Sequence, residues 1–187
     1  QARPVYLVQE VDRFKVIDPQ EVAAAFLDTT GGELDAGAIL AGYVRQLRKR
    51  GGELVGRAEV TSIAFDGGLW TVATRGGERY AAPTLVNAAG AWADEIARLA
   101  GVAPVGLKPL RRTAILVPPP AQMDMASLPM LVHLSGGFYV KPDAGMLLVS
   151  PMDETEDAPS DVQADEYDVA VAVDKLTTHT SIEVRQV

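Results

Sequence analysis

The spacing of apolar residues along the chain changes its period several times. Between residues 36 and 50, apolar side chains recur every three or four positions, which predicts an amphipathic helix with Asp35 as its N-cap. Basic residues crowd its last turn, and Gly51 and Gly52 end the pattern. A solvated helix end matched to the helix dipole explains this basic cluster better than a phosphate or nucleic-acid site.

From residue 53 the apolar period becomes two, which is typical of strands. We expect a short strand at 53–55 and then a three-stranded antiparallel meander. Its strands are the one containing Val60, Ile63 and Phe65 and those at 69–75 and 79–82, joined by Gly-Gly turns. A further strand at 85–86 and a helix at 91–100 follow.

After Pro104 the chain becomes rich in short strand patterns separated by Pro and Gly. The expected strands are 110–117, 131–134, 138–141 and 146–150, and they predict a larger antiparallel sheet. An acidic surface loop at 153–165, a helix at 167–176 and a strand at 182–184 come next. Near the start, 5–8 resembles a strand, and 22–27 fits a helix or an extended segment equally well.

Composition narrows the class of protein. The apolar fraction of 48% is that of a globular protein, and the formal charge of −8 argues against a nucleic-acid partner. The sequence has no cysteine, no apolar run long enough to span a bilayer and no secretory signal. These features favour a cytoplasmic location.

Few side chains are arranged for hydrolytic or metal chemistry. His133 and His179 have no partner at metal-ligand spacing, so we expect structural histidines and no metal site. Ser150 lies in no nucleophile elbow, and the acidic pairs of the 153–165 loop are typical of solvated charge.

Two strand positions are better candidates for binding a ligand. Arg111 and Arg112 open an otherwise apolar strand, and Tyr139 lies in another. A guanidinium binds a carboxylate through two hydrogen bonds, and a phenol on the same sheet face adds a third. Edge arginines and packed tyrosines are nevertheless common, and the residues alone favour that plainer interpretation.

The segment TLVNAAGAWADEIARLAG, residues 84–101, combines a β-branched run, a turn of small residues and a helix. This is half of a dinucleotide-binding pattern, yet the chain contains no G-x-G-x-x-G and no P-loop.

The chain resembles the D-amino-acid oxidase family of FAD-dependent oxidoreductases, which includes glycine oxidase, sarcosine oxidase and D-amino-acid dehydrogenases. The segments that carry the resemblance are ELDAGAILAGYVRQLRKRGGEL, TLVNAAGAWADEIARLAGV, GLKPLRRTAILVPPP, FYVKPDAGMLLVSP and DVQADEYDVA. The last three look most like bacterial D-arginine dehydrogenases. Family members begin with a G-x-G-x-x-G unit and end with a segment over the flavin ring, so this chain resembles the middle of such an enzyme.

The resemblance implies a mixed α+β and α/β architecture. Residues 28–103 would form part of a glutathione-reductase-like FAD-binding domain that includes the three-stranded meander. Residues 1–27 and 104–187 would form a substrate-binding domain built on an antiparallel sheet. The surfaces left open by missing segments would favour self-association.

The resemblance also implies roles for individual residues. Arg112 and Tyr139 match the positions that hold the substrate carboxylate, and Arg111 points to the opposite face as a weaker candidate. The positions that match the cofactor-binding ones are Val60 at the adenine end of FAD, Ala88, Ala89 and Gly90 in the small-residue turn, and Trp92.

The implied reaction is hydride transfer from the α-carbon of an amino acid to the flavin, giving an imino acid that hydrolyses to a keto acid. In sarcosine oxidases, a lysine on the strand equivalent to 146–150 assists oxygen, and its absence here favours a dehydrogenase. Without the glycine-rich unit, we expect weak FAD binding or none. Two alternatives remain open: a non-enzymatic module that binds a carboxylate ligand, and a folded remnant that binds nothing.

Overall fold

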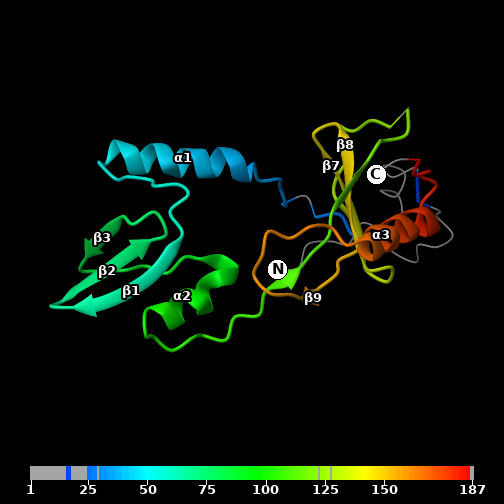
Figure 1. Ribbon diagram of the computed structural model, residues 1–187. Helices are drawn as coiled ribbons and strands as arrows, with labels where there is room; N and C mark the ends of the chain where they lie inside the picture. The colour runs from blue at the N-terminus through cyan, green and yellow to red at the C-terminus, as the bar shows by residue number, and fades with distance from the viewer. Residues whose placement is uncertain (1–15, 18–24, 29, 122, 127, 186–187) are drawn as a thin grey trace, which may run out of the picture. The chain divides into compact units, whose positions relative to one another are not determined.

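The computed structural model describes residues 16–17, 25–28, 30–121, 123–126 and 128–185 (Figure 1). The strand predicted at 5–8 and the first half of the 22–27 segment lie outside these residues. The described chain forms two compact units, which are treated separately below. The meander unit comprises residues 30–108, and the sheet unit comprises the described residues of 1–29 and 109–187.

The meander unit begins with helix α1 (Ala36–Lys49), as the apolar period predicts. The Asp35 carboxylate accepts a hydrogen bond of 2.7 Å from the Ala38 amide, which satisfies one of the unpaired donors of the first turn. Arg48 and Lys49 stand in the last turn, where cations are favoured by the helix dipole. Gly51 ends the helix with a φ of 80°, a conformation that glycine adopts without strain.

The three-stranded meander is confirmed. Strands β1 (Val60–Asp66), β2 (Leu69–Thr74) and β3 (Arg79–Ala82) pair antiparallel in the order β1-β2-β3 (Figure 1). Gly67 and Gly68 connect the first two strands with φ values of 58° and 81°, as a tight hairpin requires. Phe65 packs beside Trp70 across the same pair, with ring centroids 4.8 Å apart.

Two further strand predictions in this unit are wrong. Residues 53–55 and 85–86 carry β-type apolar side chains but are not strands, and no described strand pairs with either segment. Most of their apolar side chains face solvent: Leu54 is 56% exposed, Val55 41% and Val86 78%, whereas Leu85 is partly buried. A strand needs a neighbour to receive its hydrogen bonds, so the apolar pattern alone cannot create one. The helix predicted at 91–100 is present as a 3₁₀ turn, η2 (Gly90–Trp92), followed by α2 (Ala93–Leu99).

No apolar side chain of the meander unit is buried. The apolar stripe of α1 lies open, with Ile39, Leu40, Tyr43 and Leu47 between 41% and 73% exposed. Phe65 and Tyr80 of the meander are exposed as well. The local sequence therefore specifies the helix and the hairpins of this unit, while the described residues do not supply a core for it.

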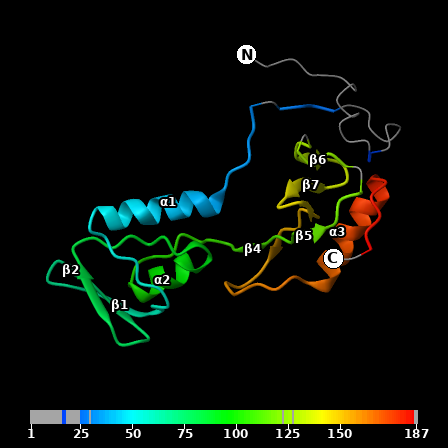
Figure 2. The same cartoon turned by 90° about the horizontal axis from the view of Figure 1, so that it is seen from above.

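The sheet unit holds the hydrophobic core. Its four-stranded antiparallel sheet has the order β5-β8-β7-β6, formed by β5 (Ile115–Val117), β8 (Met146–Ser150), β7 (Phe138–Asp143) and β6 (Leu131–His133). Helix α3 (Glu166–His179) lies against one face of this sheet (Figures 1 and 2). The core residues are Ile115, Val117, Phe138, Val140, Leu147, Val149, Ala172, Leu176 and Ile182.

Polar contacts join α3 to the ends of two strands. The Lys175 ammonium donates hydrogen bonds to the carbonyl oxygens of Gly137, at 2.7 Å, and Pro151, at 2.9 Å. These acceptors lie just before β7 and just after β8. The side chain of one helix residue thus fixes α3 against the central strands.

The strand predicted at 110–117 is divided in the structure. Its first part is β4 (Leu110–Arg111), which pairs with β9 (Thr155–Glu156) from the predicted acidic loop, and its last part is β5. The predicted strand at 182–184 is absent; there, Ile182 is buried in the core without strand pairing. Just before it, Thr180 forms a bridge with Ile17.

Candidate functional site

The turn of small residues after residue 86 is shaped by Asn87. Its side-chain amide donates a hydrogen bond of 2.8 Å to the Ala93 carbonyl, and its carbonyl oxygen accepts one of 3.3 Å from the Ala89 amide. Gly90 has a φ of 56°, and a Cβ built on it would meet no atom within 4 Å. Ala88 and Gly90 are exposed, so the turn presents backbone to solvent without bulky side chains.

The other two predicted cofactor contacts lie in the same unit. Val60 is half-buried at the start of β1, where the pairing with β2 shifts its register between Val60 and Ser62. Trp92 ends η2 and is 43% exposed. Both side chains are therefore accessible from solvent.

A buried carboxylate that sequence reasoning missed supports the segment after α2. Asp94 is 9% exposed and accepts hydrogen bonds from the amides of Val105, Gly106 and Leu107 at 3.1, 3.0 and 3.0 Å. Its place in the first turn of an amphipathic helix gives no signal of this role, because its partners lie beyond the helix end.

The four-stranded sheet has a second face, opposite the one that α3 covers. Side chains alternate along β7, so the buried Phe138 and Val140 point to α3 while Tyr139 and Lys141 point away. Tyr139 stands opposite Val132 of β6 and Ser150 of β8. Further apolar side chains on this face are Leu116 and Val132, which are 45% and 42% exposed. We call this surface the open sheet face.

Arg112 lies just after β4, in the segment that leads into β5. Burial alternates from residue 112 to residue 117: Thr113, Ile115 and Val117 are buried, whereas the residues between them are exposed. Strand pairing places Leu116 opposite Leu148, and Leu148 opposite Lys141, on the Tyr139 side of the sheet. The structure therefore places Tyr139 on the open sheet face and Arg112 in the segment between β4 and β5.

The Arg112 guanidinium is held by a neighbouring turn. Its Nε donates a hydrogen bond of 3.2 Å to the Asp153 carbonyl oxygen, and its Nη2 forms an ion pair with the Glu154 carboxylate. The side chains of Arg112 and Glu154 are 41% and 63% exposed. The guanidinium is therefore accessible to a ligand from solvent.

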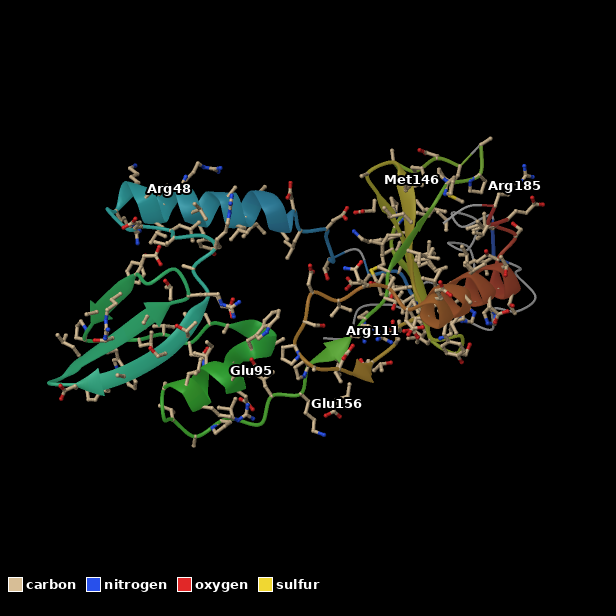
Figure 3. The ribbon with its side chains drawn as sticks, in the orientation of Figure 1. Arg48, Glu95, Arg111, Met146, Glu156 and Arg185 are labelled. Carbon is tan, nitrogen blue, oxygen red and sulfur yellow. The ribbon has the colours of Figure 1, made fainter. Side chains whose placement is uncertain are left out.

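Arg111 has a structural role. Its side chain is only 17% exposed and lies within 4 Å of three carboxylates: Asp168 at 2.8 Å, Asp157 at 3.3 Å and Asp165 at 3.8 Å. The hydrogen bond to Asp168 is the main cause that raises the pKa of Arg111 above its ordinary value. Figure 3 shows Arg111 at β4, in the small β4–β9 sheet.

The two histidines meet in the structure, which their sequence spacing does not reveal. The rings of His133 and His179 stack with centroids 4.5 Å apart, and Phe138 stacks against both. His133 Nδ1 accepts a hydrogen bond of 2.7 Å from the Gly136 amide. Among the described residues, no group of three or more His, Cys, Asp or Glu side chains is placed to hold a metal ion. In the same residues, no helix is long and apolar enough to cross a membrane.

Comparison with known proteins adds independent information. The family model described as "DAO: FAD dependent oxidoreductase" matches residues 3–183. The mitochondrial dimethylglycine dehydrogenase of Homo sapiens is 28% identical over 152 residues, which cover 80% of this chain. The corresponding enzyme of Mus musculus is 27% identical and is matched over 76% of this chain.

A solved structure shows the same fold. The L-proline dehydrogenase from P. horikoshii superposes with a TM-score of 0.75 over 95% of this chain, at 19% identity. The chain spans 48% of that structure and 17% of each of the two dimethylglycine dehydrogenases. The matched region is thus a part of each relative.

Proposed function

This chain belongs to the DAO family of FAD-dependent oxidoreductases, and we propose that it forms part of an enzyme that oxidises the C–N bond of a D-amino acid or related amine. In this proposal, residues 28–103 contribute to the FAD-binding domain. Residues 1–27 and 104–187 form the substrate-binding domain. The single observation that carries the proposal is that the Arg112 guanidinium is accessible from solvent and already binds a carboxylate, that of Glu154.

The small-residue turn fits one wall of an FAD site. Ala88, Ala89 and Gly90 leave the backbone accessible, and the open space around the Gly90 Cβ position allows a cofactor to approach closely. Asn87 keeps the turn in this shape through its own two hydrogen bonds. In the proposed site, Ala88, Ala89 and Gly90 hold FAD, with Val60 and Trp92 as further contacts. When bound, FAD supplies the two-electron acceptor for the oxidation.

The substrate carboxylate is assigned to Arg112 and Tyr139. A guanidinium offers several N–H donors in a planar fork, and a carboxylate accepts two of them at once. We assign the Tyr139 hydroxyl as a further donor to the same carboxylate. Together they fix the carboxylate and thereby orient the adjacent α-carbon, which is the contribution that this chain makes to the reaction.

The surrounding apolar side chains define what else the open sheet face accepts. Leu116, Val132 and Leu148 provide apolar surface around the polar groups, and such surface excludes water from a bound ligand. No general base has to be assigned if the substrate arrives with a neutral amine, because its nitrogen lone pair can then assist departure of the hydride.

The substrate class is supported by the names of the relatives. Dimethylglycine and proline are both amines whose nitrogen is attached to a carbon next to a carboxylate. An α-amino carboxylate is thus the chemistry that the relatives share with the Arg112 and Tyr139 pair. Preference for the D-enantiomer is our own extension, based on the resemblance to bacterial D-arginine dehydrogenases.

We further propose that the chain is inactive by itself. The meander unit exposes the apolar stripe of α1 together with two unpaired apolar segments, 53–55 and 85–86. A βαβ unit with a G-x-G-x-x-G turn would supply the pairing strands and a phosphate-binding helix end. Left uncovered, the same surface favours self-association of this chain.

The test uses an extended version of the protein that includes such a glycine-rich unit. Under anaerobic conditions, D-amino acids, proline and dimethylglycine are added, and bleaching of the flavin absorbance is followed. Replacement of Arg112 by Ala should raise the substrate concentration for half-maximal reduction about 10- to 100-fold, the loss expected for charged hydrogen bonds. Arg185→Ala, which removes an exposed arginine far along the chain, is the control. An Arg112→Ala enzyme with unchanged substrate dependence would refute the assignment.

A further inference from the structure

The ion pair between Arg112 and Glu154 joins the same two chemical groups, a guanidinium and a carboxylate, that would meet when a substrate binds. In both cases the guanidinium of Arg112 binds a carboxylate, here the carboxylate of Glu154. The Asp153 carbonyl oxygen accepts from Nε of the same guanidinium at 3.2 Å. Two of the donor nitrogens that a ligand would use are thus occupied by a turn of the chain itself.

The turn that carries Glu154 is anchored on both sides. Before it, the Asp153 carboxylate accepts hydrogen bonds from the Thr113 amide at 2.7 Å and from the Thr113 hydroxyl at 3.0 Å. After it, Thr155 begins β9 and pairs with Arg111 of β4. Arg112 lies between Thr113 and Arg111 in sequence. The anchors on its two neighbours therefore hold the Glu154 side chain close to the guanidinium.

We propose that Glu154 is an internal competitor for the substrate carboxylate and thereby sets the affinity of the Arg112 site for anionic ligands. This inference rests on the proposed function of Arg112 as the carboxylate ligand. A ligand carboxylate must displace the Glu154 carboxylate before it can accept a hydrogen bond from Nη2 of Arg112. Glu154 is 63% exposed, so it can swing into solvent when a ligand takes its place.

The expected size of the effect follows from the exposure of the pair. In an exposed ion pair, the population with the two charges in contact exceeds the separated population by a factor of about one and a half to five. The apparent affinity of a site is reduced in proportion to the fraction of protein that is competent to bind. Loss of the competitor should therefore tighten binding about twofold to sixfold, which a titration can resolve.

The test is a titration of this chain with dimethylglycine, followed by NMR shifts of backbone amides on the open sheet face. The variants are Glu154→Gln, which keeps the shape of the side chain but removes its charge, and Arg112→Gln, which removes the ligand-binding group. Glu59→Gln is the matched control, because Glu59 is about as exposed as Glu154 and forms an equally short ion pair with Arg75 in the meander unit. Dimethylaminoethanol, which lacks the carboxylate, is the control ligand.

The inference predicts that Glu154→Gln tightens dimethylglycine binding about twofold to sixfold, that Glu59→Gln leaves it unchanged, and that Arg112→Gln abolishes it. Binding by Glu154→Gln alone, with none by the wild type, would also support it. Unchanged or weaker binding in Glu154→Gln, with loss in Arg112→Gln, would overturn the competitor role and leave the carboxylate site intact. Binding that survives in Arg112→Gln, or that is absent from both wild type and Glu154→Gln, would overturn the site and the inference together.

Discussion

Arg111 of β4 donates a hydrogen bond of 2.8 Å to Asp168 in the first turn of α3. The two residues are 57 positions apart in the sequence, and both are largely shielded from solvent. Asp157 and Asp165 lie on the same guanidinium. This contact ties the small β4–β9 sheet to the helix that covers the core. It also separates the structural role of Arg111 from the ligand-binding role proposed for Arg112.

The first prediction concerns this contact. Arg111→Ala should lower the midpoint of thermal unfolding by several degrees, because three carboxylates lose the cation that they surround. Arg185→Ala should have almost no effect, since Arg185 and Glu183 form a highly exposed pair. Circular dichroism measures both midpoints. Equal midpoints for the two variants would show that the Arg111 cluster does not stabilise the fold.

The second prediction concerns the buried carboxylate of Asp94. Asp94→Asn should weaken its three hydrogen bonds to the 105–107 amides and cost about 2 kcal/mol of local stability. Hydrogen exchange read by NMR at Val105, Gly106 and Leu107 gives a direct readout. These amides should exchange faster in the variant, while amides of the four-stranded sheet keep their rates. Unchanged protection at all three amides would contradict the assigned role.

The third prediction is a pH dependence in the β2–β3 turn. The Thr74 hydroxyl donates to the Glu78 carboxylate, and this hydrogen bond is the main cause that lowers the pKa of Glu78 from its ordinary value of 4.5. A lowered pKa in the folded state means that the charged carboxylate stabilises the fold above the ordinary value. This stabilisation is lost as the pH falls through the lowered pKa.

Glu78→Gln should therefore be less stable than the wild type near neutral pH, and the difference should vanish in acid. Thermal unfolding from about pH 7 down to about pH 3 measures the difference. Thr74→Val should behave like Glu78→Gln, whereas Thr74→Ser keeps the hydroxyl and should behave like the wild type. A stability difference that persists unchanged in acid would rule out the proposed linkage.

The fourth prediction compares two leucines in the two units. Leu176 on α3 is fully buried in the core, so Leu176→Ala should destabilise the protein by about 2–5 kcal/mol. Leu40 on α1 is 64% exposed, so Leu40→Ala should change stability by no more than about 0.5 kcal/mol. Denaturant unfolding measures both values. A large loss in Leu40→Ala would show that the stripe of α1 is covered in this chain.

Local sequence patterns are sufficient to predict the elements that depend only on their own residues. Helix α1 follows from its apolar period and the Asp35 cap, and the meander follows from alternation between Gly-Gly turns. These features need no contact with distant parts of the chain.

The strands predicted at 53–55 and 85–86 failed because a strand depends on its neighbour. Their apolar composition is that of strands, but no described strand pairs with them. The same limit explains why the three amides bound by Asp94 and the stacking of His133 on His179 were missed. Each joins residues whose proximity is set by tertiary structure, which a local pattern does not encode.

The central claim is that this chain supplies one part of a flavin site and needs a glycine-rich unit to complete it. Titration of FAD, followed by quenching of its fluorescence, tests this most directly when this chain and an extended version with a G-x-G-x-x-G unit are compared. We predict that the extended version binds FAD and that this chain alone leaves the fluorescence unchanged. Tight binding by this chain alone would contradict the account, because the turn at Asn87–Gly90 would then hold the cofactor without the second half of the site.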